Sequence, residues 1–234
     1  FPERHFNCGI AEQNMMGVAA GFATTGKIPF ASTFAVFGAG RAYEQIRNSI
    51  CYPKLNVKIA VTHSGLTVGE DGATHQMLED ISLMRTLPNM TVTVPADASE
   101  TKAIIRWAAD YEGPVYIRMG RAKVEDVMPE GCTFTPGKAT LLRNGADVTL
   151  MACGVMVAPA LEAAEILDAE GISARVVNMS SIKPIDVSAI HEAVKMTGAI
   201  VSCEEHNMIG GLGAAIAEVL VQSAPAPMEM VGTE

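Results

Sequence analysis

Short apolar runs alternate with amphipathic stretches along the whole chain. The runs predict strands near residues 5–8, 28–33, 57–62, 91–94, 115–117, 148–152, 174–179 and 199–203. Apolar residues spaced three to four apart predict helices near residues 11–24, 38–51, 76–86, 98–109, 159–169, 187–196 and 212–222. Because single helices separate the strands, we expect parallel sheets with right-handed crossovers, which places the chain in the α/β class.

The alternation lapses once, between residues 120 and 136. This stretch is rich in charged residues and contains Met128-Pro129 and Pro136-Gly137, which is typical of a linker. We therefore predict a first domain over residues 1–122, a linker over 123–136 and a second domain over 137–234. Each domain should hold a largely parallel sheet flanked by helices. The abrupt start at Phe1 indicates that the first domain lacks its first part and that the chain is a portion of a longer polypeptide.

Composition narrows the class of protein. The 234 residues carry a net charge of −9 without any run of lysine or arginine, so we expect no nucleic-acid partner. No apolar run is long enough to span a bilayer and no signal peptide opens the chain, so we expect no membrane association. The five cysteines are scattered and form no Cys-x-x-Cys pair, which indicates free thiols and a cytoplasmic protein.

The most distinctive stretch is a long loop between the predicted strand at 57–62 and the helix after it. It reads His-Ser-Gly-Leu-Thr-Val-Gly-Glu-Asp-Gly-Ala-Thr-His-Gln over residues 63–76. Two imidazoles and a carboxylate pair lie among three glycines, which let a backbone turn and approach a ligand closely. The loop is longer than an ordinary connection. A solvated crossover loop is the simpler interpretation, and composition alone leaves both open.

Candidate functional residues also fall where predicted strands end. His63 follows the strand at 57–62, Arg118 the one at 115–117, Phe34 the one at 28–33, and Glu12 lies soon after residues 5–8. In open parallel sheets, ligands bind at the carboxyl ends of the strands. These four residues are therefore candidates for one cleft. For Glu12 alone, compensation of the helix dipole is the simpler explanation.

Three motifs resemble the transketolase family. They are Gly-Ile-Ala-Glu-Gln-Asn-Met (9–15), Ser-Thr-Phe-Ala-Val-Phe (32–37) and Thr-His-Ser-Gly…Gly-Glu-Asp-Gly-Ala-Thr-His-Gln (62–76), in this order and spacing. The resemblance covers nearly the whole chain and implies a pyrimidine-binding domain followed by the family's C-terminal domain. It also implies a thiamine-diphosphate-dependent transferase of the pentose phosphate pathway, which moves a two-carbon ketol unit from a ketose phosphate to an aldose phosphate.

The resemblance assigns the cofactor contacts to the first two motifs. Glu12 would bind the aminopyrimidine ring of thiamine diphosphate and assist removal of the thiazolium C2 proton. Phe34 and Phe37 would form the apolar pocket for that ring. For an isolated phenylalanine, plain core packing is the ordinary interpretation.

The resemblance assigns the substrate contacts to the loop and to one arginine. His63 and Arg118 would hold the phosphate of the sugar, since a guanidinium stays charged and offers two donors. Asp71 would contact a substrate hydroxyl. His75 would contact the carbonyl end of the donor and assist proton transfer.

One family signature is absent from the chain. No Gly-Asp-Gly is followed some thirty residues later by Asn, the pattern that in this family holds Mg2+ and diphosphate. The resemblance therefore implies that this chain holds only the pyrimidine end of the cofactor. A diphosphate-binding domain or N-terminal transketolase subunit would supply Mg2+, in a homodimer or a dimer of heterodimers. Tyr43 stays unassigned, because residues 37–43 do not align cleanly, and Ala73 stands where many relatives have proline.

Other interpretations remain open at this stage. The runner-up enzyme is a 1-deoxy-D-xylulose-5-phosphate synthase, which typically lacks a histidine at position 63 and the Gly-Glu-Asp-Gly run. A β-subunit of a 2-oxoacid dehydrogenase agrees less well with the motifs. A non-catalytic α/β partner subunit is the alternative from another class. In the second domain, Cys-Glu-Glu-His (203–206) before Gly-Gly-Leu-Gly (210–213) is a weak signal for a metal or phosphate site; in this family the second domain mainly supports the dimer.

Overall fold

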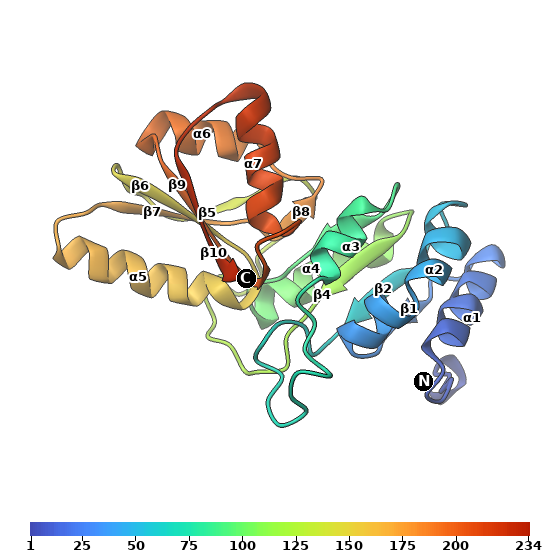
Figure 1. Ribbon diagram of the computed structural model, residues 1–234. Helices are drawn as coiled ribbons and strands as arrows, with labels where there is room; N and C mark the ends of the chain where they lie inside the picture. The colour runs from blue at the N-terminus through green and yellow to red at the C-terminus, as the bar shows by residue number, and fades with distance from the viewer.

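Two five-stranded sheets lie side by side in the computed structural model, which describes all residues from 1 to 234 (Figure 1). The strand order is β1-β2-β4-β3-β8 in the first sheet and β10-β9-β6-β7-β5 in the second. Neighbouring strands are parallel except where β8 meets β3 and where β5 meets β7. The predicted α/β class with largely parallel sheets is confirmed.

The first sheet takes most of its strands from the first half of the chain. Its members are β1 (Phe30–Ala31), β2 (Lys58–Val61), β3 (Thr91–Thr93), β4 (Val115–Arg118) and β8 (Ser181–Lys183). Its helices are α1 (Glu12–Thr24), α2 (Tyr43–Gln45), α3 (Asp80–Thr86) and α4 (Ala98–Asp110). Wider π-helical turns, Val36–Arg41 and Ile46–Cys51, flank α2. Short 3-10 turns occur at Pro2–Arg4 and Gly154–Met156.

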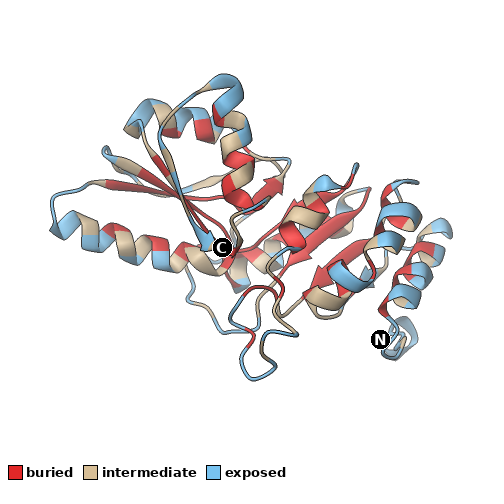
Figure 2. Cartoon of the chain, in the orientation of Figure 1, coloured by how far each residue is buried: buried red, intermediate tan, exposed pale blue.

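The second sheet belongs wholly to the second half of the chain. Its strands are β5 (Thr140–Arg143), β6 (Val148–Ala152), β7 (Ala174–Asn178), β9 (Ile200–Asn207) and β10 (Met228–Thr233). Its helices are α5 (Val157–Ala169), α6 (Val187–Thr197) and α7 (Leu212–Ser223). The three inner strands, β6, β7 and β9, are mostly buried, while the outer faces of the helices are exposed (Figure 2), as expected for a sheet covered on both faces.

Sequence periodicity missed three strands and added one. β5 and β10 are half-exposed edge strands of mixed polarity, and β8 has only three residues, so none shows a buried apolar run. The predicted strand at residues 5–8 is an irregular segment instead. Its apolar residue Phe6 packs on Phe22, with ring centroids 4.9 Å apart, and the Asn7 side chain accepts a hydrogen bond from Gly9 N. Helix α3 begins at Asp80 and not near residue 76, because Met77 forms a β-bridge with Gly65.

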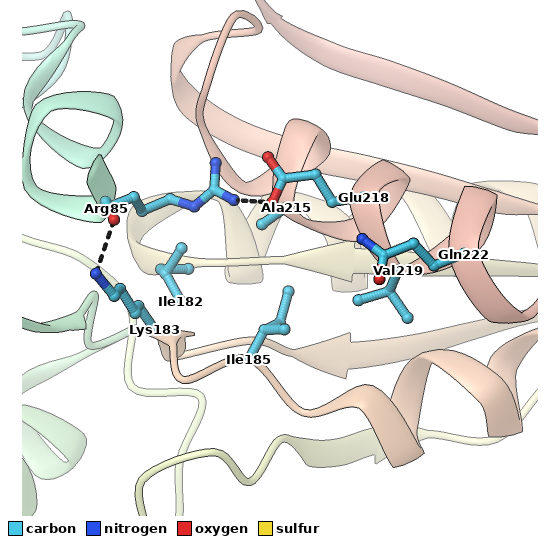
Figure 3. A pocket seen from close by; sticks show the side chains of 8 residues that line it. All are labelled: Arg85, Ile182, Lys183, Ile185, Ala215, Glu218, Val219 and Gln222. Atoms are coloured by element: carbon cyan, nitrogen blue, oxygen red, sulfur yellow. Dashed lines mark hydrogen bonds and ion pairs between the residues drawn. The ribbon is translucent and has the colours of Figure 1, made fainter. Parts of the chain in front are cut away.

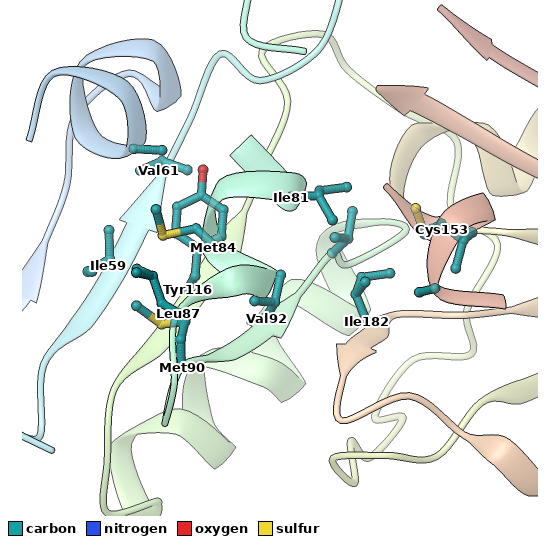
Figure 4. Packing of buried hydrophobic residues seen from close by; sticks show 14 of the residues in the cluster. Ile59, Val61, Ile81, Met84, Leu87, Met90, Val92, Tyr116, Cys153 and Ile182 are labelled. Atoms are coloured by element: carbon teal, nitrogen blue, oxygen red, sulfur yellow. The ribbon is translucent and has the colours of Figure 1, made fainter. Parts of the chain in front are cut away.

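The two halves of the chain share one hydrophobic core. Figure 4 shows Met84, Leu87 and Met90 packed with Ile59 and Tyr116 in the first domain. The same cluster continues through Ile182 of β8 to Cys153 and to residues of the second sheet. β8 pairs with β3 in the first sheet although it lies far along the chain, and the two domains therefore meet at a packed hydrophobic boundary.

The stretch between the domains, residues 119–139, contains no helix or strand. It is nevertheless attached to the first domain, because Asp97 Oδ2 accepts hydrogen bonds from Val127 N and Met128 N. The other oxygen, Asp97 Oδ1, caps α4. The five cysteines are free, and three of them are buried. None of the helices combines the length and the apolar character needed to cross a bilayer.

Candidate active site

Four aromatic rings from three segments gather at the carboxyl ends of β1 and β2. A parallel bridge between Phe34 and Thr62 extends the β1–β2 pairing and so places Phe34 beside His63. Their rings stack with centroids 3.6 Å apart and planes 12° from parallel. Phe37, one helical turn further on, stacks on Phe34 at 6.1 Å. His75, from the far end of the loop, points its ring edgewise at Phe37, 5.4 Å away. All four side chains are only partly buried, so this aromatic cluster can take a ligand.

His63 occupies an unusual backbone conformation. Its φ is 58°, in the left-handed region that costs an L-residue about 1–2 kcal/mol. Its Nδ1 lies 2.9 Å from Thr62 Oγ1, which leaves Nε2 available to a ligand. Strain of this kind in a loop is typical of functional sites.

A guanidinium connects the aromatic cluster to Glu12. Arg41 Nη1 lies 2.8 Å from Glu12 Oε2, and the Arg41 Cζ stands 4.5 Å from the centre of the Phe37 ring. Glu12 is only 7% exposed. Burial raises the pKa of Glu12, but a backbone hydrogen bond and Arg41 outweigh it and hold the pKa below its ordinary 4.5. Glu12 is therefore ionised in this chain, although a group that shares a proton would need the opposite shift.

Arg41 is a site residue that the sequence analysis missed. It follows Phe37 by four positions in a helical stretch, which places both side chains on one face. The four-residue spacing between Phe37 and Arg41 is the sequence signal that could have identified Arg41. The signal is hard to recognise because residues 37–43 do not align cleanly with the family motif.

The glycine-rich loop carries the remaining candidates. It extends away from both sheets near the boundary between the domains (Figure 1). Asp71 lies exposed at its tip and forms no hydrogen bond or ion pair, while His75 Nδ1 lies 2.8 Å from Thr74 Oγ1. The structure thus places His75 in the aromatic cluster and leaves Asp71 outside it.

Arg118 does not reach this open face, and its predicted phosphate contact is corrected here. The side chain is 5% exposed, and its Nε lies 2.8 Å from Asp80 Oδ2. Burial works against the charge, but Asp80 more than compensates and raises the pKa of Arg118 above its ordinary value. Nη2 donates to the carbonyl oxygens of Met77 and Glu205. The guanidinium is neutralised and holds the structure behind the loop, so it cannot also serve a solvent-borne phosphate.

The exposed guanidinium at the end of β4 belongs to Arg121. Its Nη1 donates to Val68 O at 3.0 Å, and no carboxylate pairs with it. It lies so close to Gly69 that a Cβ there would come within 2.3 Å of Nη1. The rule of strand ends selected Arg118 because it ends the strand. Three residues later the chain has left the sheet, and only the structure shows which of the two arginines is accessible.

A cavity of about 320 Å³ lies elsewhere, between α3, β8 and α7 (Figure 3). Its cations are already engaged, because Lys183 Nζ donates to the carbonyl oxygens of Arg85 and Leu87, and Arg85 pairs with Glu218. It contains none of the aromatic cluster, so we do not take it as the active site.

Known proteins match this chain over both of its domains. Residues 1–126 match the family description "Transketolase, pyrimidine binding domain", and residues 137–234 match "Transketolase, C-terminal domain". The chain belongs to the transketolase family. Membership of this pyrimidine-binding family implies thiamine diphosphate as the cofactor.

Individual transketolase relatives agree over nearly the whole chain. A protein named as a transketolase C-terminal section, from Methanocaldococcus jannaschii, is 55% identical over 95% of this chain and 70% of its own length. A 6-deoxy-6-sulfo-D-fructose transketolase subunit from Clostridium sp. is 45% identical over 99% of this chain and 72% of its own length. The solved structure of a split gene transketolase, described as an inactive β4 tetramer, is 61% identical with a TM-score of 0.94, covering 100% of this chain and 76% of that one.

We predict that loss of the buried Arg118–Asp80 ion pair strongly lowers the stability of the protein. Asp80→Asn should lower the free energy of unfolding by about 3–5 kcal/mol, because it leaves a buried guanidinium without its counter-charge. The pair of half-buried Arg143 and exposed Asp168, 3.2 Å apart, supplies the control, and Asp168→Asn should cost less than about 1 kcal/mol. Urea unfolding at pH 7 measures both variants. Equal losses of unfolding free energy in the two variants would show that the buried pair stabilises the fold no more than the control pair does.

Proposed function

We propose that this chain is the C-terminal subunit of a split transketolase, which transfers a two-carbon ketol unit from a ketose phosphate to an aldose phosphate. The observation that carries the proposal is the aromatic cluster of Phe34, Phe37, His63 and His75 with the Glu12–Arg41 pair beside it. It joins a flat apolar surface, a buried carboxylate and two imidazoles at one edge of a parallel sheet, where ligands bind.

The residues present fit the pyrimidine end of thiamine diphosphate. Phe34 and Phe37 offer partly exposed, nearly parallel rings, 13° apart, for stacking against a flat heterocycle. Glu12 offers a buried carboxylate for the polar edge of that ring. When bound, thiamine diphosphate supplies the nucleophilic carbon and the electron sink for cleavage beside a ketose carbonyl. Arg41 contacts both Phe37 and Glu12 in this chain, so we infer that it shifts when the cofactor binds and leaves the Glu12 carboxyl free to share a proton with a ring nitrogen.

The diphosphate end of the cofactor requires another polypeptide. The chain has no group of three or more histidine, cysteine or acidic side chains placed to hold a metal ion, and its net charge of −9 does not favour a diphosphate. We propose that an N-terminal subunit supplies Mg2+ and the diphosphate contacts, in a dimer of heterodimers. The free cysteines fit a cytoplasmic enzyme of the pentose phosphate pathway.

The sugar phosphate would lie along the glycine-rich loop. Arg121, in place of Arg118, is the exposed cation for its phosphate, because it lies against Val68 and Gly69 of the loop, and His63 is the imidazole at the start of the loop. We propose that His75 handles the proton at the reacting end, because it faces the Phe34 and Phe37 rings. Asp71 contacts a sugar hydroxyl only if substrate draws the loop tip inward.

The same residues favour transketolase over the alternatives. His63 and the Gly-Glu-Asp-Gly run are the features that a 1-deoxy-D-xylulose-5-phosphate synthase typically lacks, and both are present here. An ionised, buried glutamate beside partly exposed aromatic rings supports a catalytic subunit over a non-catalytic one. The proposal is tested by combining the chain with a diphosphate-binding transketolase subunit and assaying ketol transfer between sugar phosphates. Turnover only with pyruvate as donor would favour the synthase.

Substitution of Glu12 tests the cofactor site. In the reconstituted enzyme, Glu12→Gln should slow deuterium exchange at C2 of bound thiamine diphosphate by about 10²–10⁴-fold, since it removes the acid–base group next to the ring. NMR of the quenched cofactor measures the exchange. Glu44→Gln, on an exposed turn of α2, is the matched control and should exchange like the wild type. An exchange rate like that of the wild type in Glu12→Gln would show that Glu12 only compensates the helix dipole and takes no part in proton transfer.

Arg121 and its neighbour Lys123 test the phosphate contact. Arg121→Ala should raise KM for phosphorylated sugars roughly tenfold to a hundredfold, because a charge-assisted contact contributes about 1.5–3 kcal/mol. Lys123→Ala removes an equally exposed cation two residues further on and should leave KM unchanged. Steady-state kinetics with phosphorylated and unphosphorylated sugars measures both. A loss that is equal for the two kinds of sugar would show that Arg121 only supports the loop.

A further inference from the structure

The end of β9 brings two adjacent glutamates of the second domain to the domain boundary, and they point to different elements. Glu204 stays within its own domain, where its carboxylate accepts hydrogen bonds from Leu212 N and Gly213 N at the start of α7. Glu205 reaches the first domain. Its Oε1 accepts hydrogen bonds from Leu66 N at 3.0 Å and Thr67 N at 2.7 Å, both in the glycine-rich loop.

The contact between Glu205 and the loop is close and buried. Glu205 is only 8% exposed. Gly65 approaches it so tightly that a Cβ there would lie 2.1 Å from Glu205 Oε2, and the φ of Gly65 is +82°. The backbone at Gly65 therefore bends around the carboxylate in a conformation suited to glycine. Oriented N–H groups around an anion form a recognised kind of binding concavity, and here the anion is a side chain of the other domain.

The main chain around Glu205 is held independently of its side chain. Glu205 O accepts from Arg118 Nη2 at 3.0 Å, and Asn207 N donates to Leu78 O at 2.9 Å. His206 Nε2 lies 3.4 Å from Ser82 N. Removing the Glu205 carboxylate therefore leaves the end of β9 docked on the first domain and frees only the amides of Leu66 and Thr67.

The loop needs such a support between its two histidines. His63 opens it and His75 closes it, and residues 69–71 and 73–74 between them are exposed. Gly65 N, Leu66 O and Val68 O have partners of their own, but the amides of Leu66 and Thr67 are held by Glu205 alone. We propose that Glu205 is a positioning residue of the active site: its carboxylate fixes Leu66 and Thr67 so that the loop presents His63 and His75 together to the substrate. This inference rests on the proposed function for its catalytic consequence, whereas the ordering of the loop stands on the contacts alone.

Amide exchange tests the ordering directly on the full chain. Hydrogen–deuterium exchange, resolved by NMR at Leu66 and Thr67, should quicken about tenfold to a hundredfold in Glu205→Ala, because both amides lose a charged acceptor. Amides of β9 should keep wild-type protection. Unchanged exchange at both loop amides would overturn the inference.

Two conservative variants separate geometry from charge. Both hydrogen bonds end on one oxygen, so the amide oxygen of Glu205→Gln can accept both, whereas Glu205→Asp is one methylene too short. We expect Gln to retain most of the protection and Asp to lose it. If Asp resembles the wild type more than Gln does, the negative charge and not the position of the acceptor is what matters, and the inference fails. These variants also carry the test if Glu205→Ala does not fold.

Kinetics of the enzyme reconstituted with its diphosphate-binding subunit tests the catalytic consequence. Glu205→Ala should lower kcat about tenfold to a hundredfold through misplacement of the loop, with cofactor affinity unchanged and with Gln rescuing the rate better than Asp. Glu218→Gln is the matched control: it also removes a carboxylate that bridges the domains, through Arg85, but touches no loop residue. It should keep wild-type kcat.

The possible outcomes distinguish the two claims. Faster loop exchange in Glu205→Ala with unchanged kcat would overturn the positioning role and leave the proposed function intact. A wild-type enzyme without ketol transfer would overturn the proposed function, while the exchange data would still decide whether Glu205 orders the loop. A Glu218→Gln variant as impaired as Glu205→Ala would show that loosened domains, and not the loop, cause the loss.

Discussion

The buried ion pair of Arg118 and Asp80 is the interaction on which the geometry of the site depends. It joins the end of β4 to the first residue of α3, with Tyr116 OH as a further donor to Asp80. Arg118 Nη2 donates to Met77 O, at the C-terminal end of the glycine-rich loop, and to Glu205 O, in the strand of the second domain that contacts the first. Desolvation of such a pair is costly and is offset only when the remaining donors are used. Here Nη2 is used to fix the loop and the domain boundary at one point.

The accessible chemistry lies in front of this pair and is built from weaker, adjustable contacts. Arg41 is half-exposed, lies over the Phe37 ring and neutralises Glu12. His63 and His75 are held mainly by stacking and by neighbouring hydroxyls. A rigid buried pair behind a rearrangeable surface suits a site that is completed by a cofactor and by another subunit, because the surface can change its partners without disturbing the fold.

Most of the fold and part of the site could be predicted from the sequence, for identifiable reasons. Strands such as β2 and β6 are buried on both faces, so their apolar runs are visible, whereas β8 depends on pairing with β3 from far along the chain. The motifs located Glu12, Phe34, His63 and His75, and the structure brings these residues together or, for Glu12, connects them through Arg41. The strand-end rule predicted Arg118 because it ends β4, whereas the burial of Arg118 and the exposure of Arg121 are visible only in the structure. The contact of Glu205 with Leu66 and Thr67 spans two domains, and no local pattern encodes it.

The central claim is that this chain holds one half of a thiamine diphosphate site. Titration calorimetry with thiamine diphosphate and Mg2+ tests it most directly, on the chain alone, on a diphosphate-binding transketolase subunit alone and on their mixture. We expect weak binding to either chain and tight, Mg2+-dependent binding to the mixture, because the stacking surface and the diphosphate ligands then act on one molecule. Submicromolar, Mg2+-dependent binding to this chain alone would contradict it.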